Sequence, residues 1–354
     1  MIDERELEAA VAAGIIDAAT QARLVQFVRD HRRGVAGPDE EQFRLLTGFN
    51  DIFVTIAIGL LLFAIGSLGA AVFPALGPFL AAAASWGLAE YFTRRRRMAL
   101  PSIVLLLSFV GSVFGAVLLV GTALQPAPAS PLPASFDIGG VGLPAIWPIL
   151  AMAAAAIAAG LHWWRFKVPV TVAAGAAAAG GLVTALLMAA VPPPLATALL
   201  LPLIFVLGLV CFGIAMDFDA RDPARMTRWT DVAFWLHLLA APAIVHPVFA
   251  MTGILRATPS TGAALFVILV YAVLTIVALA IDRRALLVSA LFYVIFAIRA
   301  LVESGASVGL SGALTALVIG GFLVLLSAAW RPIRARVLLW LPGKLAMRLP
   351  VASV

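Results

Sequence analysis

Residues 51–73 read DIFVTIAIGLLLFAIGSLGAAVF, and after Asp51 this stretch contains no charged residue. A helix that crosses the hydrocarbon core of a bilayer needs about 20 apolar residues, so the stretch is long enough to span. Its apolar residues are continuous, whereas a strand of a membrane β-barrel alternates apolar and polar residues over about 10 positions. Because backbone groups in lipid must be satisfied within the segment, residues 51–73 predict a transmembrane α-helix.

The rest of the chain has the same character. Of its 354 residues, 63% are hydrophobic and only 12% are charged, whereas a soluble domain carries about 25% charged residues. Such a chain cannot cover a globular surface with polar groups, so the composition predicts an all-α integral membrane protein whose main partner is the lipid bilayer. Apolar windows predict about ten transmembrane helices: 51–73, 76–92, 99–124, 144–164, 168–190, 195–216, 231–251, 261–281, 285–303 and 310–330.

The basic residues predict the orientation of these helices, because short cytoplasmic loops are rich in Lys and Arg. If the N-terminus is cytoplasmic, all but two of the 24 basic residues fall on the cytoplasmic side; the exceptions are Arg256 and Arg299. This placement explains the net charge of +6 without a nucleic-acid partner. We therefore expect a multi-pass protein of the bacterial cytoplasmic (inner) membrane with both termini inside.

The sequence divides into four predicted parts: a cytoplasmic helical hairpin (1–33), a linker (34–48), the transmembrane bundle (49–332) and a basic amphipathic tail (333–354). In the hairpin, Gly14 is expected to end a first helix and Asp17 to cap a second one at Ala18–His31. The hairpin is either a surface appendage or a docking module for a protein partner. In the tail, Arg and Lys alternate with apolar residues, which suits a helix in the inner membrane interface.

Four helices near the start resemble the last four, which suggests a parallel 4+2+4 internal repeat. The resemblance lies in Asp51 and Asp231 at two helix starts, in the basic turns Arg94–Arg97 and Asp282–Arg284, and in Trp164-Arg165 and Trp330-Arg331. The alternative is that cytoplasmic arginines after every second helix produce the similarity by themselves.

Ionisable groups inside a membrane are costly and mark candidate sites. His246 in the seventh predicted span and Arg299 in the ninth are expected at similar depth, and Glu303 lies four residues after Arg299 on the same helix face. These residues predict a site for an anionic or zwitterionic ligand, or a proton relay through His246. The alternative is an Arg299–Glu303 salt bridge near the outer interface.

The seventh predicted span holds further candidates, namely Asp231, Trp235 and His237. Asp231 is expected to stabilise a helix start, with a cytoplasmic ion gate as the alternative. His162 and His237 could in principle ligate a haem, but two histidines are a weak pattern, and we expect no cofactor. Cys211 is the single cysteine, so the sequence predicts neither a disulfide framework nor a cysteine metal site.

The stretch LEAAVAAGIIDAATQARLVQFV at residues 7–28, followed by many apolar helices, resembles the start of the DUF2157-like bacterial membrane proteins. The resemblance implies a short cytoplasmic helical segment before a polytopic bundle, and it implies no activity. FNDIFV at 49–54 matches that group's first span only in part.

The sequence favours a transporter or permease-like protein that binds a small solute. A non-catalytic membrane scaffold or sensor, which docks a partner through residues 1–33, is the alternative. No nucleotide-binding or hydrolase motif is found in the sequence, and we do not expect an enzyme. Substrate, direction, energy source and oligomeric state stay open.

Overall fold

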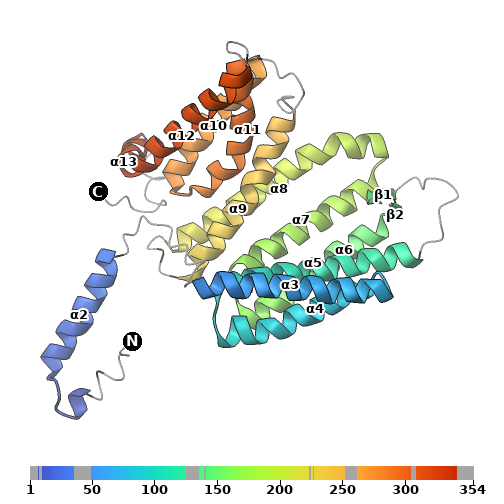
Figure 1. Cartoon of the computed structure of the whole chain (residues 1–354). Helices are drawn as coiled ribbons and strands as arrows, with labels where there is room; N and C mark the ends of the chain where they lie inside the picture. Colours follow the sequence, from blue (N-terminus) through green and yellow to red (C-terminus); the bar gives the residue numbers. More distant parts are fainter. Residues whose placement is uncertain are drawn as a thin grey trace. The chain divides into compact units, whose positions relative to one another are not determined.

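The computed structural model describes residues 7, 10–35, 49–124, 135–138, 141–222, 225, 227–251, 261–303 and 308–340. The chain divides into two compact units, one within residues 1–43 and one within residues 44–350. Each unit is built almost wholly from helices (Figure 1).

The N-terminal unit contains the helix α2 (Ala18–Val35). Gly14 has a positive φ of 70°, a conformation that glycine adopts at little cost, and the amide of Ile15 returns to the carbonyl of Ala10 across 2.9 Å. Asp17 then caps α2, because its Oδ1 accepts a 2.6 Å hydrogen bond from the amide of Thr20. This confirms the predicted N-cap, although the helix continues past the predicted end at His31 as far as Val35.

The larger unit is a bundle in which a helix occupies each of the ten windows predicted from apolar residues. Its helices are α3 (Phe49–Val72), α4 (Leu76–Ala89), α5 (Ala99–Leu124), α6 (Ile146–Phe166), α7 (Val170–Ala190), α8 (Pro193–Arg221), α9 (Arg228–Ala250), α10 (Thr261–Ile281), α11 (Ala285–Glu303), α12 (Val308–Ala328) and α13 (Trp330–Leu339). A π-helical segment, η1 (Glu90–Arg95), extends α4. A small antiparallel hairpin, β1 (Ser135–Ile138) and β2 (Val141–Pro144), lies between α5 and α6.

Six of the described helices, α3 and α5–α9, are long and apolar enough to cross a membrane. A seventh is obtained if the bent pair of α12 and α13 is one span. With 14 residues, α4 is shorter than the 20 or so that a bilayer requires. The protein is therefore an all-α, multi-pass, membrane-type bundle.

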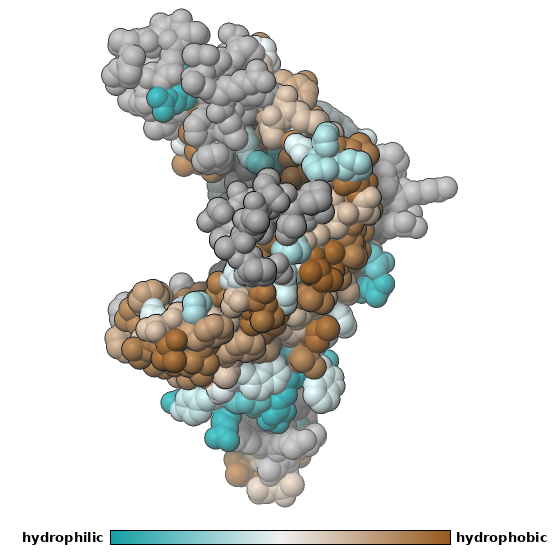
Figure 2. Space-filling model, turned by 90° about the vertical axis from the view of Figure 1, so that its right-hand side faces the viewer, coloured by the Kyte–Doolittle hydropathy of each residue, from teal (hydrophilic) through white to brown (hydrophobic). Residues whose placement is uncertain are grey.

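The surface of the larger unit is apolar, as expected of a chain solvated by lipid. On α3 alone, Phe63 is 75% exposed and Leu68 is 72% exposed. Apolar side chains cover much of the described surface seen in Figure 2. A soluble monomer rarely exposes apolar patches of more than a few hundred Å², so these faces indicate contact with acyl chains.

Helices α8 and α9 form a closely packed pair, and this pair carries the site described below. A Cβ on Gly208 of α8 would lie 2.9 Å from the carbonyl carbon of Ala243 in α9 and 3.0 Å from its side chain. Only glycine therefore permits this approach without a shift of one helix. The buried α9 residues Val232, Leu236 and Val245 complete the contact with neighbouring helices.

Candidate functional site

Six buried charged residues gather where α8, α9 and α13 meet the turn between α10 and α11. They are three aspartates and three arginines, so their formal charges balance. Asp219, Asp222, Asp282, Arg283 and Arg334 are at most 8% exposed, and the side chain of Arg225 is 8% exposed. We call these six residues, together with His237, the ion cluster.

At the centre of the ion cluster, the carboxylate of Asp219 accepts from two partners. His237 Nε2–H donates to Asp219 Oδ2 across 2.9 Å. Arg283 Nε donates to the same oxygen across 3.2 Å, and Arg283 Nη2 donates to Oδ1. One carboxylate oxygen is thus shared between an imidazole and a guanidinium.

The backbone of the α10–α11 turn is what aims Arg283 into the bundle. Asp282 has a φ of 56°, in the left-handed region that ends many helices. The amide of Arg283 then bonds the carbonyl of Ala278 across 2.9 Å, as in a Schellman motif. Since the chain reverses here, Arg283 reaches back to Asp219 and to the carbonyl of Thr230, 3.3 Å away.

Asp282 forms the second part of the ion cluster and joins α13 to it. Its Oδ2 accepts from Arg225 Nη1 across 2.9 Å, and its Oδ1 accepts from Trp330 Nε1 across 2.8 Å. Arg334 Nε lies 3.8 Å from Oδ1. Burial lowers the pKa of the Arg225 guanidinium and Arg283 adds to this shift, while the charge of Asp282 opposes it.

Asp222 has a local structural role at the start of α9. Its Oδ2 accepts from the amide of Thr227 at 2.7 Å, from the Thr227 hydroxyl at 2.6 Å and from the Thr230 hydroxyl at 2.9 Å. These bonds hold the short α8–α9 connection, so Asp222 positions His237 without touching it.

His237 is the histidine of the ion cluster, and histidine is the side chain whose unperturbed pKa lies closest to physiological pH. Its side chain is fully buried, and the ring of Phe212 packs edge-on with the centroids 5.2 Å apart. Since Nε2 donates to Asp219, a neutral ring carries its lone pair on Nδ1. Within the described part of the chain, Nδ1 has no hydrogen-bond partner.

A cluster of this kind is costly as a device for stability. Desolvation of buried ions often exceeds their mutual attraction, so replacement by apolar residues can be neutral or stabilising. Of the ion cluster, Asp219 and His237 lie in helices long enough to cross a membrane. Buried ionisable residues in such helices tend to mark ion or substrate pathways. In the ion cluster, the buried lone pair of a neutral His237 ring and the shared Asp219 carboxylate are the groups on which such a role would rest.

The residues predicted around His246 lie elsewhere on the bundle. His246 is on an exposed face of α9, where its Nδ1 bonds the hydroxyl of Tyr293 in α11. Arg299 is exposed on α11, and Glu303 is the last residue of that helix. The Glu303 side chain lies outside the described atoms, so an Arg299–Glu303 site stays a prediction.

Of the other candidates, only His237 belongs to the ion cluster. Asp231 lies in the first turn of α9 and is exposed, as suits a residue that stabilises a helix start. Trp235 packs half-buried in the apolar clusters beside α6 and α7. Sequence reasoning missed Asp219, counted Arg225 and Arg283 only as loop charges, and counted Arg334 only as a charge of the basic tail.

One signal in the sequence could have pointed to Asp219. Asp217 and Asp219 occupy the last turns of α8, where the helix dipole disfavours a carboxylate. An acidic residue at such a position requires a cation nearby. Asp217 forms a salt bridge with Arg221 on the surface, whereas Asp219 forms a salt bridge with Arg283 in the interior of the bundle.

A second buried histidine lies in the other half of the bundle. His162 Nδ1 lies 3.2 Å from the Thr171 hydroxyl, and its ring packs among Trp86, Phe109 and Phe166. Nearby in sequence, Arg165 pairs with both oxygens of Glu90, at 2.6 and 3.0 Å. Protein side chains occupy the surroundings of both His162 and His237, and the expectation of no haem stays a prediction.

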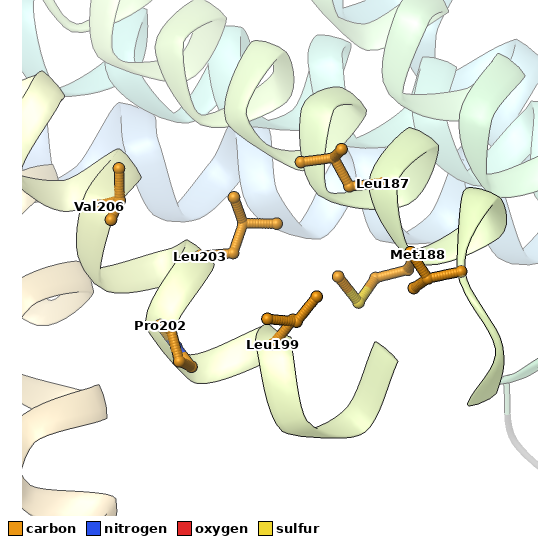
Figure 3. A pocket seen from close by; sticks show the side chains of 7 residues that line it. Leu187, Met188, Leu199, Pro202, Leu203 and Val206 are labelled. Atoms are coloured by element: carbon orange, nitrogen blue, oxygen red, sulfur yellow. The ribbon is translucent and has the colours of Figure 1, made fainter. Parts of the chain in front are cut away.

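An open groove lies between α7 and α8. It has a volume of about 260 Å³, and its apolar side chains point toward one another in Figure 3. The lining consists of Leu187, Met188, Val191, Leu199, Pro202, Leu203 and Val206. A lining without charged or hydrogen-bonding side chains cannot orient a polar solute, so the ion cluster is the stronger candidate.

Comparison with models of known protein families, with curated proteins and with solved structures finds no match for this chain. The ion cluster is therefore interpreted from its own geometry and charge.

Proposed function

We propose that this protein is a carrier of a small solute whose cycle is coupled to protons through Asp219, His237 and Arg283. The observation that supports the proposal is the single carboxylate shared by an imidazole and a guanidinium inside a membrane bundle. With His237 neutral, the three aspartates and three arginines of the ion cluster balance. A proton on His237 adds a charge that competes with Arg283 for Asp219.

This competition would give the ion cluster two states, one with neutral His237 and one with protonated His237. When His237 is protonated, its hydrogen bond to the Asp219 carboxylate becomes an ion pair and is stronger, so the attraction between Asp219 and Arg283 weakens. Arg283 is fixed to the α10–α11 turn, while Asp219 and His237 belong to α8 and α9. Proton uptake would thereby loosen the α10–α11 hairpin from the α8–α9 pair, which is the kind of relative motion that alternating access requires.

The proposed topology has ten spans, with both termini in the cytoplasm of a bacterium. Two features support it: a helix at each apolar window and the gathering of basic residues at one end of alternate helices. A parallel repeat is supported by the packing of α5 against α3, α4 and α6, which resembles that of α11 against α9, α10 and α12. Membership of the DUF2157-like group remains part of the proposal and adds no activity to it.

Transport assays in proteoliposomes test the carrier. The purified protein is reconstituted with internal pyranine, and amino acids, dicarboxylates, sugars and organic cations are added one class at a time. We expect one class to drive proton entry with wild type, and entry to be lost with His237→Gln. The carrier is rejected if no class moves protons and a native mass spectrum retains only lipid.

His246→Gln is the matched control, because His246 is on the same helix but exposed. Its variant should transport like wild type if the ion cluster is the coupling site. If His246→Gln and Arg299→Ala abolish transport while His237→Gln does not, the site lies between α9 and α11 instead.

A membrane scaffold or sensor is the second candidate, and the separate N-terminal unit favours it. Ile15, just before α2, is 76% exposed and Leu24, within α2, is 40% exposed, so apolar side chains are available to a partner. This candidate predicts that deletion of residues 1–33 removes the cellular phenotype while His237→Gln leaves it unchanged. A carrier predicts the reverse.

A further inference from the structure

The last described helices, α12 and α13, are bent by 72° at Ala329. Pro332, in the first turn of α13, has no amide proton to continue the hydrogen bonds of α12, which accounts for the break. The chain resumes helical bonding at Ile333, whose amide bonds the carbonyl of Ala329 across 3.0 Å. If α12 crosses the membrane, α13 consequently lies close to the plane of the membrane surface.

One face of α13 is fixed to the bundle. Trp330, Arg334 and Val337, spaced by four and three residues, are at most 8% exposed. Trp330 and Arg334 contact Asp282, and the guanidinium of Arg284 lies 4.8 Å from the centre of the Trp330 ring. The orientation of α13 about its own axis is therefore set by the ion cluster.

The opposite face combines cations with large apolar side chains. Leu339 is 83% exposed and Trp340 is 81% exposed, and Arg331 and Arg336 are exposed on the same helix. The segment 330–340 contains no Asp or Glu. Basic residues beside Trp and Leu on a surface helix are typical of helices that lie in an anionic membrane interface.

We infer that this outer face of α13 binds anionic phospholipid, with Arg331 and Arg336 at the headgroup phosphates and Leu339 and Trp340 in the upper acyl region. Trp prefers this depth because its ring is apolar and its N–H is polar. A soluble acidic protein would match the positive charge of this face, but it would leave Leu339 and Trp340 without an apolar environment. Charge and exposed apolar area together favour a lipid surface.

The inference does not require that the protein transports a solute. It adds a physical link, because the lipid-facing helix holds Asp282 through Trp330, and Asp282 is adjacent to Arg283. A change in the lipid headgroups bound to α13 would thereby shift the position of the α10–α11 turn.

Lipid retention in native mass spectra tests the inference. The purified protein is titrated with phosphatidylglycerol or with phosphatidylcholine in mild detergent, and the bound lipids are counted. Since the exposed apolar side chains of Leu339 and Trp340 would hold the two arginines at the headgroups, we expect Arg331→Gln/Arg336→Gln to weaken phosphatidylglycerol binding about tenfold to thirtyfold and to leave phosphatidylcholine unchanged.

Arg95→Gln/Arg97→Gln is the matched control, because it removes the same charge from an exposed turn after α4. It should lower phosphatidylglycerol retention much less. Equal losses in the two variants would overturn the inference, since net charge alone would then account for binding.

Trp340 provides a second readout that leaves the arginines intact. In nanodiscs with brominated lipids, the difference in fluorescence between wild type and Trp340→Phe reports this ring alone. We expect bromine to quench it. If aqueous acrylamide quenches it and brominated lipid does not, α13 faces water or a protein partner and the lipid surface is excluded.

Discussion

Asp219 of α8 and His237 of α9 are 18 residues apart in the chain, and the imidazole reaches the carboxylate across 2.9 Å in the interior of the bundle. The two side chains meet because α8 and α9 pack closely at Gly208 and because Asp222 holds the connection between them. Arg283 completes the arrangement from a third element. The Asp219 carboxylate and the close approach at Gly208 can each be changed by a separate substitution.

Asp219→Asn should strongly destabilise the bundle. It removes the negative partner of Arg283, which is 2% exposed, and loss of one member of a buried ion pair costs about 3–5 kcal/mol. The measurement is unfolding by SDS titration from mixed micelles.

Asp217→Asn is the control for Asp219→Asn, because its pair with Arg221 is exposed, at 57% and 64%. Exposed pairs contribute about 0–1 kcal/mol. Similar losses in the two variants would mean that Asp219 is not an essential partner of Arg283.

Gly208→Leu should force α8 and α9 apart. Extra side-chain volume in a packed interface typically costs about 1–3 kcal/mol, and here Ala243 leaves no space for it. Gly213→Leu, five residues later in the same helix, should be tolerated because a Cβ there meets nothing within 4 Å. Thermal unfolding of both variants in detergent compares them, and equal midpoints would contradict the close approach.

Trp330→Phe should release α13 from the ion cluster. The change keeps an aromatic ring but removes the N–H that donates to Asp282, and a buried acceptor that loses its donor costs about 1–3 kcal/mol. Limited proteolysis of the C-terminal region should become faster. Trp340→Phe, at an exposed position, should digest like wild type.

Asp17 should make the stability of α2 depend on pH. Hydrogen bonds from Thr20 lower the pKa of Asp17 from its ordinary value of 3.8. A lowered folded-state pKa means that the cap is fully stabilising above about pH 4 and is lost as the pH falls through the lowered value. The protection of the Thr20 amide from hydrogen exchange, measured by mass spectrometry relative to the intrinsic exchange rate at each pH, should fall at acidic pH.

Asp17→Asn separates the cap from its charge. Asn also caps helices, so protection of the Thr20 amide should persist but lose its pH dependence. Asp17→Ala should lose protection at every pH. Protection that still falls at low pH in Asp17→Asn would assign the effect to another group.

The helices of the bundle could be predicted from the sequence because their cause is local. A window such as 99–124 is apolar throughout, and the structure has α5 over those residues. The predicted N-cap at Asp17 depends on side chains three residues apart. Helix length alone does not establish that all ten helices cross the membrane, since α4 has 14 residues.

The candidate site could be predicted only in part. His237 was identified because a histidine in an apolar helix is conspicuous, and so was His246. Asp219 and Arg283 were not, since each lies near a helix end and stands beside the charged residues of the adjoining loop. Asp219 and Arg283 are 64 positions apart in the chain. No local sequence pattern predicts a contact between residues so far apart.

By itself, the sequence determined that this protein is a helical membrane bundle with its basic residues at particular helix ends. The free energy of transfer to lipid is a sum over residues, and the backbone of each membrane segment must form its hydrogen bonds within that segment. Composition and the length of an apolar window therefore suffice to predict the helices. Only the tertiary structure decided which arginine meets which aspartate and that three such pairs are buried. A hydrogen bond forms only within about 3 Å, and that separation depends on how tightly neighbouring helices pack and how their turns reverse.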